Sequence, residues 1–131
     1  MIRMTWNKGL QFTATDHNNH RITVDTDTEY GGFDKGIRPI EFLLVSLGGC
    51  MGMDIVSILQ KKGGKIDTFE IIVDGQRAEE HPKRYEKITV KIICKGEYRQ
   101  EDLQRSLELS RDKYCGAVAT LQNPPDIEFS L

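Results

Sequence analysis

Cysteine is scarce in this sequence, and its three copies stand at irregular intervals as Cys50, Cys94 and Cys115. An odd number without regular spacing argues against the disulfide framework that is typical of small secreted proteins. The first residues, Met1 to Asn7, also lack an apolar run of signal-peptide length. We therefore expect a cytoplasmic protein. In that reducing compartment, two neighbouring thiols would serve redox chemistry or metal binding rather than form a structural crosslink.

An excess of charge of either sign is also missing. The 131 residues include 18 basic and 20 acidic side chains, which are interspersed and give a formal net charge of -2 at pH 7. No basic region is present that could bind phosphates, so we do not expect nucleic acid as a partner. A chain of this length with 38% hydrophobic residues is sufficient for one ordinary core. The sequence therefore predicts a single domain over residues 1–131.

Only one long hydrophobic run occurs, from Phe42 to Leu59, and Asp54 is its single charged residue. The run is about as long as the shortest membrane-spanning helices. The glycines, the serines and the aspartate of the run argue against insertion into a membrane. The remainder of the chain is rich in charge and alternates between apolar and polar residues. We therefore expect no membrane partner, and we interpret the run as a helix buried in a soluble core.

The boundaries of this helix are well marked. Pro39 suits a first helical position and Glu41 suits the first turn, whereas Lys61 and Lys62 followed by two glycines are typical of a helix end. At 100° per residue, a narrow stripe contains Ser46, Cys50, Asp54 and Ser57.

The other faces of the helix are apolar, so the helix must be surrounded by protein. Met51 and Met53 are interpreted as core filler, with a substrate pocket as the alternative. Because a small domain rarely supplies so much cover, we infer that a second copy of the chain packs on the helix, and that Gly48 and Gly49 allow another backbone to approach closely.

The alternation of apolar and polar residues, together with the turn residues between such segments, predicts the remaining strands and helices. A hairpin and a third strand precede the long helix, two paired strands follow it, and an amphipathic helix, a short helix and a last strand close the chain. The expected ranges are Ile2–Trp6, Leu10–Thr15, His20–Thr26, Thr68–Asp74, Lys87–Cys94, Glu101–Tyr114, Cys115–Leu121 and Ile127–Leu131.

Two segments resemble the cysteine motifs of the OsmC/Ohr family of thiol-dependent hydroperoxide reductases. The first resembles the signature helix and the second resembles the motif around the second cysteine of that family. The matching residues are Arg38 to Cys50 (RPIEFLLVSLGGC), Asp54 to Leu59 (DIVSIL), Lys113-Tyr114-Cys115, Val118 and Thr120-Leu121. Two such motifs in one chain are specific, and with the order of the expected elements the resemblance covers essentially the whole chain.

The resemblance implies an α+β, OsmC-like fold that forms an intertwined homodimer, with long central helices packed against antiparallel β-sheets and active sites at the subunit interface. It implies that Cys50 is the peroxidatic cysteine, which attacks a small organic hydroperoxide, and that Cys115 is the resolving cysteine. It also implies an external dithiol as reductant, in the best-known members a lipoylated protein, and no metal, haem or flavin cofactor.

A peroxide-cleaving cysteine must be a thiolate, so a positive or hydrogen-bonding partner is expected near Cys50. The candidates for the positive charge are Arg21 and Arg38. Asp54, one helical turn from Cys50, would oppose a thiolate if charged and close.

This chain departs from the family pattern at one glutamate. In family members this glutamate commonly holds the arginine that activates the thiol. In the better-studied branch it stands ten residues before the first cysteine, where this chain has Ile40. Glu41, nine residues before Cys50, should face away from it by about 180° on a straight helix. The chain therefore resembles the more divergent OsmC-like branch.

Other chemistries remain open from the residues alone. The three histidines, His17, His20 and His81, show no metal-ligand spacing to the cysteines, so no metal is expected. A cysteine–histidine hydrolase would need His17 or His20 within hydrogen-bond reach of a cysteine. The stronger alternative is a non-catalytic dimer that senses oxidants through Cys50 and Cys115 or binds a small apolar ligand. Cys94 is interpreted as a packing residue.

Overall fold

Two antiparallel β-sheets and three α-helices make up the computed structural model, which describes residues 1–131. The chain divides into two units, Met1–Leu43 and Leu44–Leu131. The sheets and the long helix confirm the predicted α+β class, and the single-domain assignment stays a prediction.

The N-terminal unit is built on a three-stranded sheet in the order β1-β2-β3, formed by β1 (Arg3–Lys8), β2 (Gln11–Thr15) and β3 (Arg21–Val24). This confirms the predicted hairpin and third strand. The hairpin turn requires glycine at Gly9, because its φ is +56° and an added Cβ would lie 2.6 Å from the carbonyl oxygen of Gly31.

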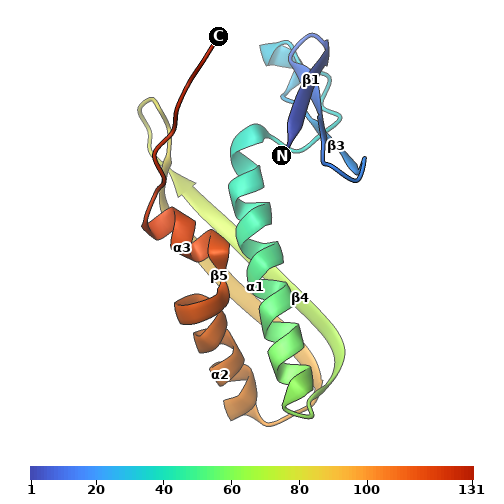
Figure 1. Ribbon diagram of the computed structural model, residues 1–131, viewed down its shortest axis with the longest axis vertical. Coiled ribbons are helices and arrows are strands. Elements are labelled where there is room, and N and C mark those ends of the chain that lie inside the picture. The colour runs from blue at the N-terminus through green and yellow to red at the C-terminus, as the bar shows by residue number, and fades with distance from the viewer. The chain divides into compact units, whose positions relative to one another are not determined.

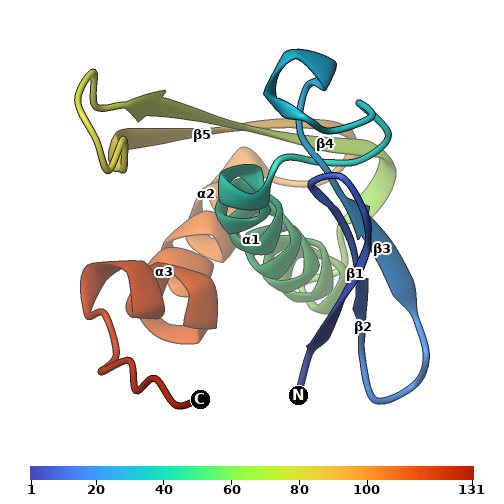
Figure 2. The same cartoon turned by 90° about the horizontal axis from the view of Figure 1, so that it is seen from above.

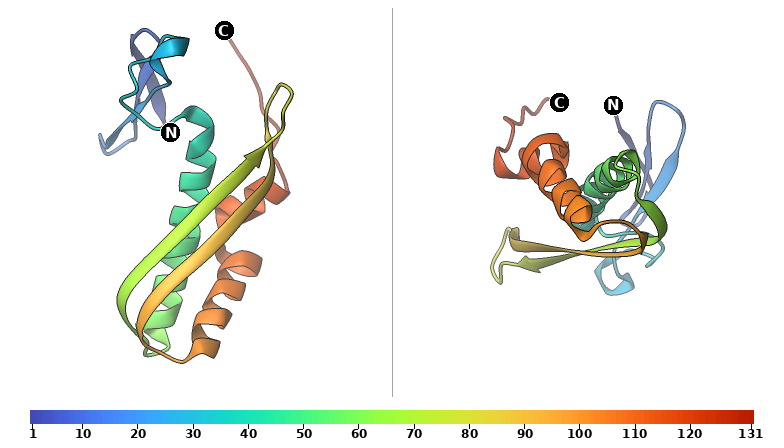
Figure 3. Two further views of the ribbon diagram at one scale, coloured as in Figure 1. Left: turned by 180° about the vertical axis from the view of Figure 1, so that it is seen from behind. Right: turned by 90° about the horizontal axis from the view of Figure 1, so that it is seen from below.

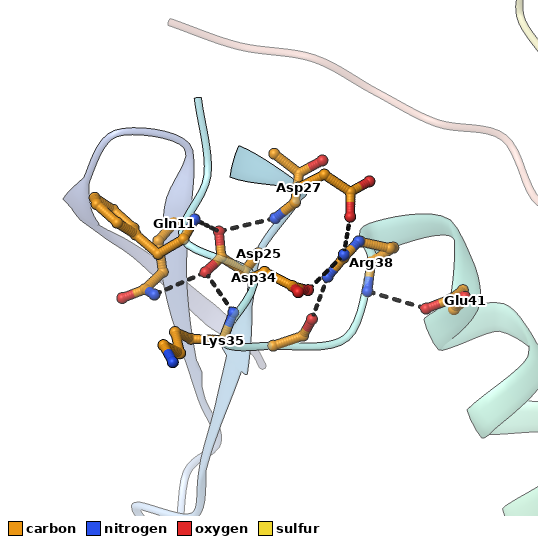
Figure 4. A network of polar contacts seen from close by, with 10 residues as sticks. Gln11, Asp25, Asp27, Asp34, Lys35, Arg38 and Glu41 are labelled. Carbon is orange, nitrogen blue, oxygen red and sulfur yellow. Dashed lines mark hydrogen bonds and ion pairs between the residues drawn. The ribbon is translucent and has the colours of Figure 1, made fainter. Parts of the chain in front are cut away.

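The loop after β3 is organised around one buried carboxylate, Asp25, which is only 1% exposed. Its two oxygens accept hydrogen bonds from the side chain of Gln11 and from the backbone N–H groups of Thr26, Phe33 and Lys35, at 2.8 to 3.1 Å (Figure 4). Asp25 therefore links both the start and the later part of the loop to Gln11 of β2. The ordered 3-10 turn η1 (Thr28–Tyr30) lies within it.

The C-terminal unit combines a long hairpin with helices on one side of it. A 3-10 turn at the end of the N-terminal unit, η2 (Pro39–Glu41), leads into α1 (Phe42–Lys61), as Pro39 predicts. β4 (Lys65–Arg77) and β5 (Tyr85–Glu97) then pair over their whole length, well beyond the predicted strand ends (Figure 3). α2 (Gln100–Leu109), the π-turn η3 (Ser110–Tyr114) and α3 (Gly116–Gln122) complete the unit (Figure 1).

The core of this unit lies between the helices and one face of the hairpin (Figure 2). The central buried residues come from one stripe of α1, at Leu47, Met51 and Ile55. Alternate residues of the strands pack against this stripe, as a period of two requires. The packed strand residues are Phe69, Ile71 and Val73 of β4 and Ile88, Val90 and Ile92 of β5, and Leu103 and Leu107 of α2 pack against the same cluster.

Two sequence predictions differ from the structure. The C-terminal residues 124–131 form no strand, although Ile127–Leu131 was expected to do so, and Ile127, Phe129 and Leu131 are exposed. A strand is stabilised only by pairing with another, and this segment is paired with no strand of either sheet. Met53 was expected to fill the core with Met51, but it is 76% exposed, because it lies on the side of α1 opposite Met51 and Ile55.

Residues Pro39–Lys61 are the one helical stretch that length and composition would allow to cross a membrane. The same stretch supplies the core of the C-terminal unit. The buried stripe of this helix has the core role that was expected from the sequence.

Candidate functional site

The first side chains of the site come from the polar stripe of α1. Cys50 and Asp54 stand one turn apart, so both project from the same side of the helix. Both are half-buried, next to the apolar stripe of Leu47 and Met51. The predicted stripe is thereby confirmed as a place where a thiol and a carboxylate lie side by side.

The second thiol is placed by an irregular turn between α2 and α3. The helix widens into the π-turn η3, and the N–H of Cys115 then donates to the carbonyl oxygen of Ser110 at 2.8 Å. Cys115 itself has an extended backbone and is the N-cap of α3, as predicted for a cysteine at a helix start. Single turns of π-helix of this kind are frequent at functional sites.

Cys50 of α1 and Cys115, the N-cap of α3, pack together in the core of the C-terminal unit. The Sγ atoms of Cys50 and Cys115 and a carboxylate oxygen of Asp54 all lie within 4.8 Å of one another. All three cysteines are free thiols. Since a disulfide bond is about 2.05 Å long, the two sulfurs must approach each other further before they can bond.

The environment of Cys115 favours its protonated form. The residue is 3% exposed, and this burial is the main cause that raises the pKa of its thiol. Its sulfur accepts the N–H of Val118 at 3.4 Å, which lowers the pKa, but a hydrogen bond with Cys50 raises it again. Burial therefore outweighs the stabilisation that a helix N-terminus gives to a thiolate, and Cys115 can donate its proton toward Cys50.

Ser110 is a further residue of the site, which the sequence analysis missed. It is fully buried, and its hydroxyl donates to Asp54 Oδ2 at 2.9 Å. This bond joins the turn that carries Cys115 to the helix that carries Cys50. A serine inside an amphipathic helix gives no sequence signal of such a contact, which depends on the tertiary packing of α1 against η3.

The other three candidates, Arg21, Arg38 and Glu41, lie in the N-terminal unit. Arg21 is exposed at the start of β3. Arg38 binds Asp34 at 2.7 Å and also Asp27, and these two carboxylates raise the pKa of its guanidinium (Figure 4). The carboxylate of Glu41 accepts the N–H of Arg38 at 3.2 Å. The role of these residues beside a thiol stays a prediction.

A surface hollow of about 310 Å³ lies beside the second cysteine. It is lined by Cys115, by the charged residues of η3 and by residues of α3, among them Ala119 and Gln122. Two of the charges in its wall are paired, since Arg111 binds Asp112 at 2.5 Å.

The third cysteine and the histidines are not part of this cluster. Cys94 is half-buried in β5, opposite Phe69 of β4. His20 is exposed and its Nδ1 lies 2.9 Å from the carboxylate of Asp16, within the N-terminal unit. Neither observation supports a cysteine–histidine hydrolase.

Comparison with known proteins connects this geometry with a family. The family model described as OsmC-like protein matches residues 32–130 of the chain. Protein YhfA of Escherichia coli K12 is 31% identical over 129 residues, which cover 98% of this chain and 93% of YhfA.

Solved structures show the same fold. A hypothetical protein from Aquifex aeolicus VF5 superposes with a TM-score of 0.82 and 31% identity, covering 95% of this chain and 87% of that one. An organic hydroperoxide resistance protein OsmC from Legionella pneumophila superposes with a TM-score of 0.64 and 10% identity, over 94% of this chain and 88% of that one. The second likeness concerns the fold alone.

Proposed function

Since the chain belongs to the OsmC-like protein family, we propose that it is a thiol-dependent enzyme that reduces small organic hydroperoxides to alcohols. The observation that supports this most is the meeting of two free thiols, Cys50 and Cys115, within 4.8 Å. A pair of this kind can take up the two oxidising equivalents of a hydroperoxide as one disulfide bond. The substrate class is the one implied by the resemblance of both cysteine motifs to the OsmC/Ohr family.

The chemistry proceeds in three steps. The thiolate of Cys50 attacks the distal oxygen of the hydroperoxide, the O–O bond breaks, and the alkoxide takes up a proton and leaves as the alcohol. Cys50 is then a sulfenic acid. The sulfur of Cys115 attacks that of Cys50, so that an S–S bond forms, the S–O bond breaks and water leaves with the proton of Cys115. An external dithiol reduces the disulfide and is itself oxidised to a disulfide.

Burial supports the assignment of Cys50 as the first nucleophile. Cys50 is half-buried, whereas Cys115 is 3% exposed and burial raises its pKa. The thiol that keeps its proton is suited to donate a hydrogen bond to the neighbouring thiolate and to react second.

We further propose that the active form is a homodimer, as the resemblance implies. Only 28% of the apolar window within Pro39–Lys61 is buried by the chain itself. An apolar helix face left uncovered in water is unfavourable, and a second copy of the chain would cover it. A cytoplasmic location and a dithiol or lipoylated reductant stay predictions.

The decisive experiment is an assay of cumene hydroperoxide consumption by the reduced protein with a recycling dithiol. Because attack requires its thiolate, Cys50→Ser is expected to lose at least about 100-fold in kcat/KM, of the order typical for removal of a nucleophile. Cys115→Ser is expected to react once and accumulate the sulfenic acid on Cys50, which mass spectrometry detects.

Cys94→Ser is the matched control, since it removes a thiol outside the cluster and should retain the parent rate. A Cys50→Ser variant that consumes hydroperoxide as fast as the parent would refute the mechanism. If the parent forms the disulfide between Cys50 and Cys115 but is not recycled by any dithiol, the protein is a sensor and not a peroxidase.

A further inference from the structure

The three groups that meet at the site are also a set of metal ligands. Two thiols and a carboxylate converge from α1 and from the start of α3, and their ligand atoms all lie within 4.8 Å of one another. Cysteine sulfur and aspartate oxygen are groups that Zn²⁺ and similar ions bind. We propose that the reduced protein binds one borderline-soft divalent cation, Zn²⁺ or Cd²⁺, through Cys50, Cys115 and Asp54.

The geometry favours this binding with little movement. Four ligands around zinc form a tetrahedron with Zn–S bonds of about 2.3 Å, so two bound sulfurs are about 3.8 Å apart. The sulfurs of Cys50 and Cys115, within 4.8 Å, need to approach by about 1 Å or less to reach this separation. Closing the disulfide requires a larger movement than binding the ion does.

No ion pair compensates the charge of Asp54. The basic residues of Leu44–Leu131 that form ion pairs bind other carboxylates, and none of these pairs includes Asp54; they are Lys62, Lys65, Arg84, Arg99, Arg105 and Arg111. A bound dication would compensate the charge of two thiolates and the carboxylate.

Hydrogen bonds from neighbouring groups hold two of the three ligands in place. Ser110 donates to Oδ2 of Asp54, which leaves the other carboxylate oxygen available for the ion. The N–H of Val118 donates to the sulfur of Cys115. Contacts of this kind orient ligands and increase metal affinity. Three protein ligands leave a fourth position for water, and the small number of oxygens disfavours Mg²⁺ and Ca²⁺.

Metal binding and thiol oxidation then exclude each other. A bound ion occupies the sulfur electrons with which Cys50 would attack an oxidant, and a disulfide would leave Asp54 as the only ligand. The metal site uses the same residues as the proposed function but does not rest on it, because binding requires only reduced thiols and no turnover.

The test is a titration of the reduced full-length protein with Cd²⁺, followed by the ultraviolet absorption of cadmium–sulfur bonds, and with Zn²⁺ against a coloured chelator. One ion per chain is expected. Cys50→Ser and Cys115→Ser should each lower the affinity by more than about 100-fold, and Asp54→Asn by about 10-fold. Cys94→Ser should bind like the parent.

The absence of a cadmium–sulfur band in the parent, or parent-like binding by Cys115→Ser, would overturn the proposal. So would an equal loss in Cys94→Ser. Circular dichroism checks that each variant retains its helices, and parent protein with its thiols alkylated gives a comparison without substitution, in which the band should be lost. A protein that consumes hydroperoxide but gives no band refutes the metal site alone, whereas a band without peroxide turnover refutes only the proposed function.

Discussion

At the scale of single residues, the site depends on how deeply each thiol is buried. Cys50 and Cys115 have the same side chain, but Cys115 is almost fully enclosed and Cys50 is not. Desolvation disfavours a thiolate, so the two thiols are suited to different steps. The sequence predicted both cysteines and the position of Asp54 beside Cys50. It could not predict Ser110, whose bond to Asp54 joins residues that are distant in the chain.

Asp25 of the N-terminal unit provides a prediction of pH dependence. Burial raises the pKa of its carboxyl group, but hydrogen bonds from Gln11, Thr26, Phe33 and Lys35 outweigh this and lower the pKa to about 2. The usual pKa of aspartate is about 3.9. Because the folded-state pKa is the lower one, the stabilisation is fully present above about pH 4 and is lost as the pH falls from about 4 toward 2.

Asp25→Asn is therefore expected to lower the Tm of unfolding near neutral pH, and the difference from the parent should shrink as the pH falls through this window. Thermal unfolding followed by circular dichroism at several pH values measures the effect. Asp67→Asn, at an exposed position of β4, is the control. A difference between parent and Asp25→Asn that stays constant from about pH 6 to about pH 2 would contradict the prediction.

At the scale of elements, patterns that depend on near neighbours in the sequence were predicted well, and those that depend on distant partners were not. Pro39 and the pair Gly63-Gly64 bound the long helix because a proline ring and a terminal glycine act locally. The hairpin β4–β5 extends beyond both ends of the predicted strands, into charged residues such as Arg77 and Glu97, because backbone pairing tolerates polar side chains on an exposed face. The prediction of a last strand at Ile127–Leu131 was wrong, because a strand forms only by pairing with a neighbouring strand.

The glycine pair of α1 gives a prediction at the same scale. A Cβ at Gly48 would lie 3.0 Å from Cγ2 of Val73, whereas a Cβ at Gly49 would meet nothing within 4 Å in the chain. The sequence analysis inferred that this glycine pair lets another part of the protein approach α1 closely. At Gly48, the part that approaches is β4 of the same chain. Alanine favours a helix over glycine by about 1 kcal/mol, and overpacking costs about 1–3 kcal/mol.

We therefore expect Gly48→Ala to be less stable than Gly49→Ala by about 1–3 kcal/mol in denaturant unfolding. Dilution to concentrations at which the chain is monomeric removes any contribution of a partner chain at Gly49. The opposite order of the two variants would show that β4 does not limit the space at Gly48.

At the scale of the whole molecule, one chain leaves much apolar surface of α1 uncovered. The stripe that includes Val45, Gly49 and Met53 lies opposite the buried stripe of Leu47, Met51 and Ile55, as spacings of four residues require. Val45 is 49% exposed and Met53 is 76% exposed. The sequence predicted that a helix apolar on nearly all sides needs more cover than one small domain provides, and the burial of α1 is consistent with this inference.

The proposed homodimer is tested by placing a charge on this stripe. Met53→Glu would have to bury a carboxylate on each side of the interface without a partner, so the dimer Kd is expected to rise more than about 100-fold, which corresponds to about 2.7 kcal/mol. Sedimentation equilibrium over a range of protein concentrations measures it. Gln122→Glu adds the same charge at an exposed position of α3 and should leave the Kd unchanged. A parent chain that stays monomeric at all concentrations, or a Met53→Glu variant that dimerises as well as the parent, would show that this face of α1 is not the interface.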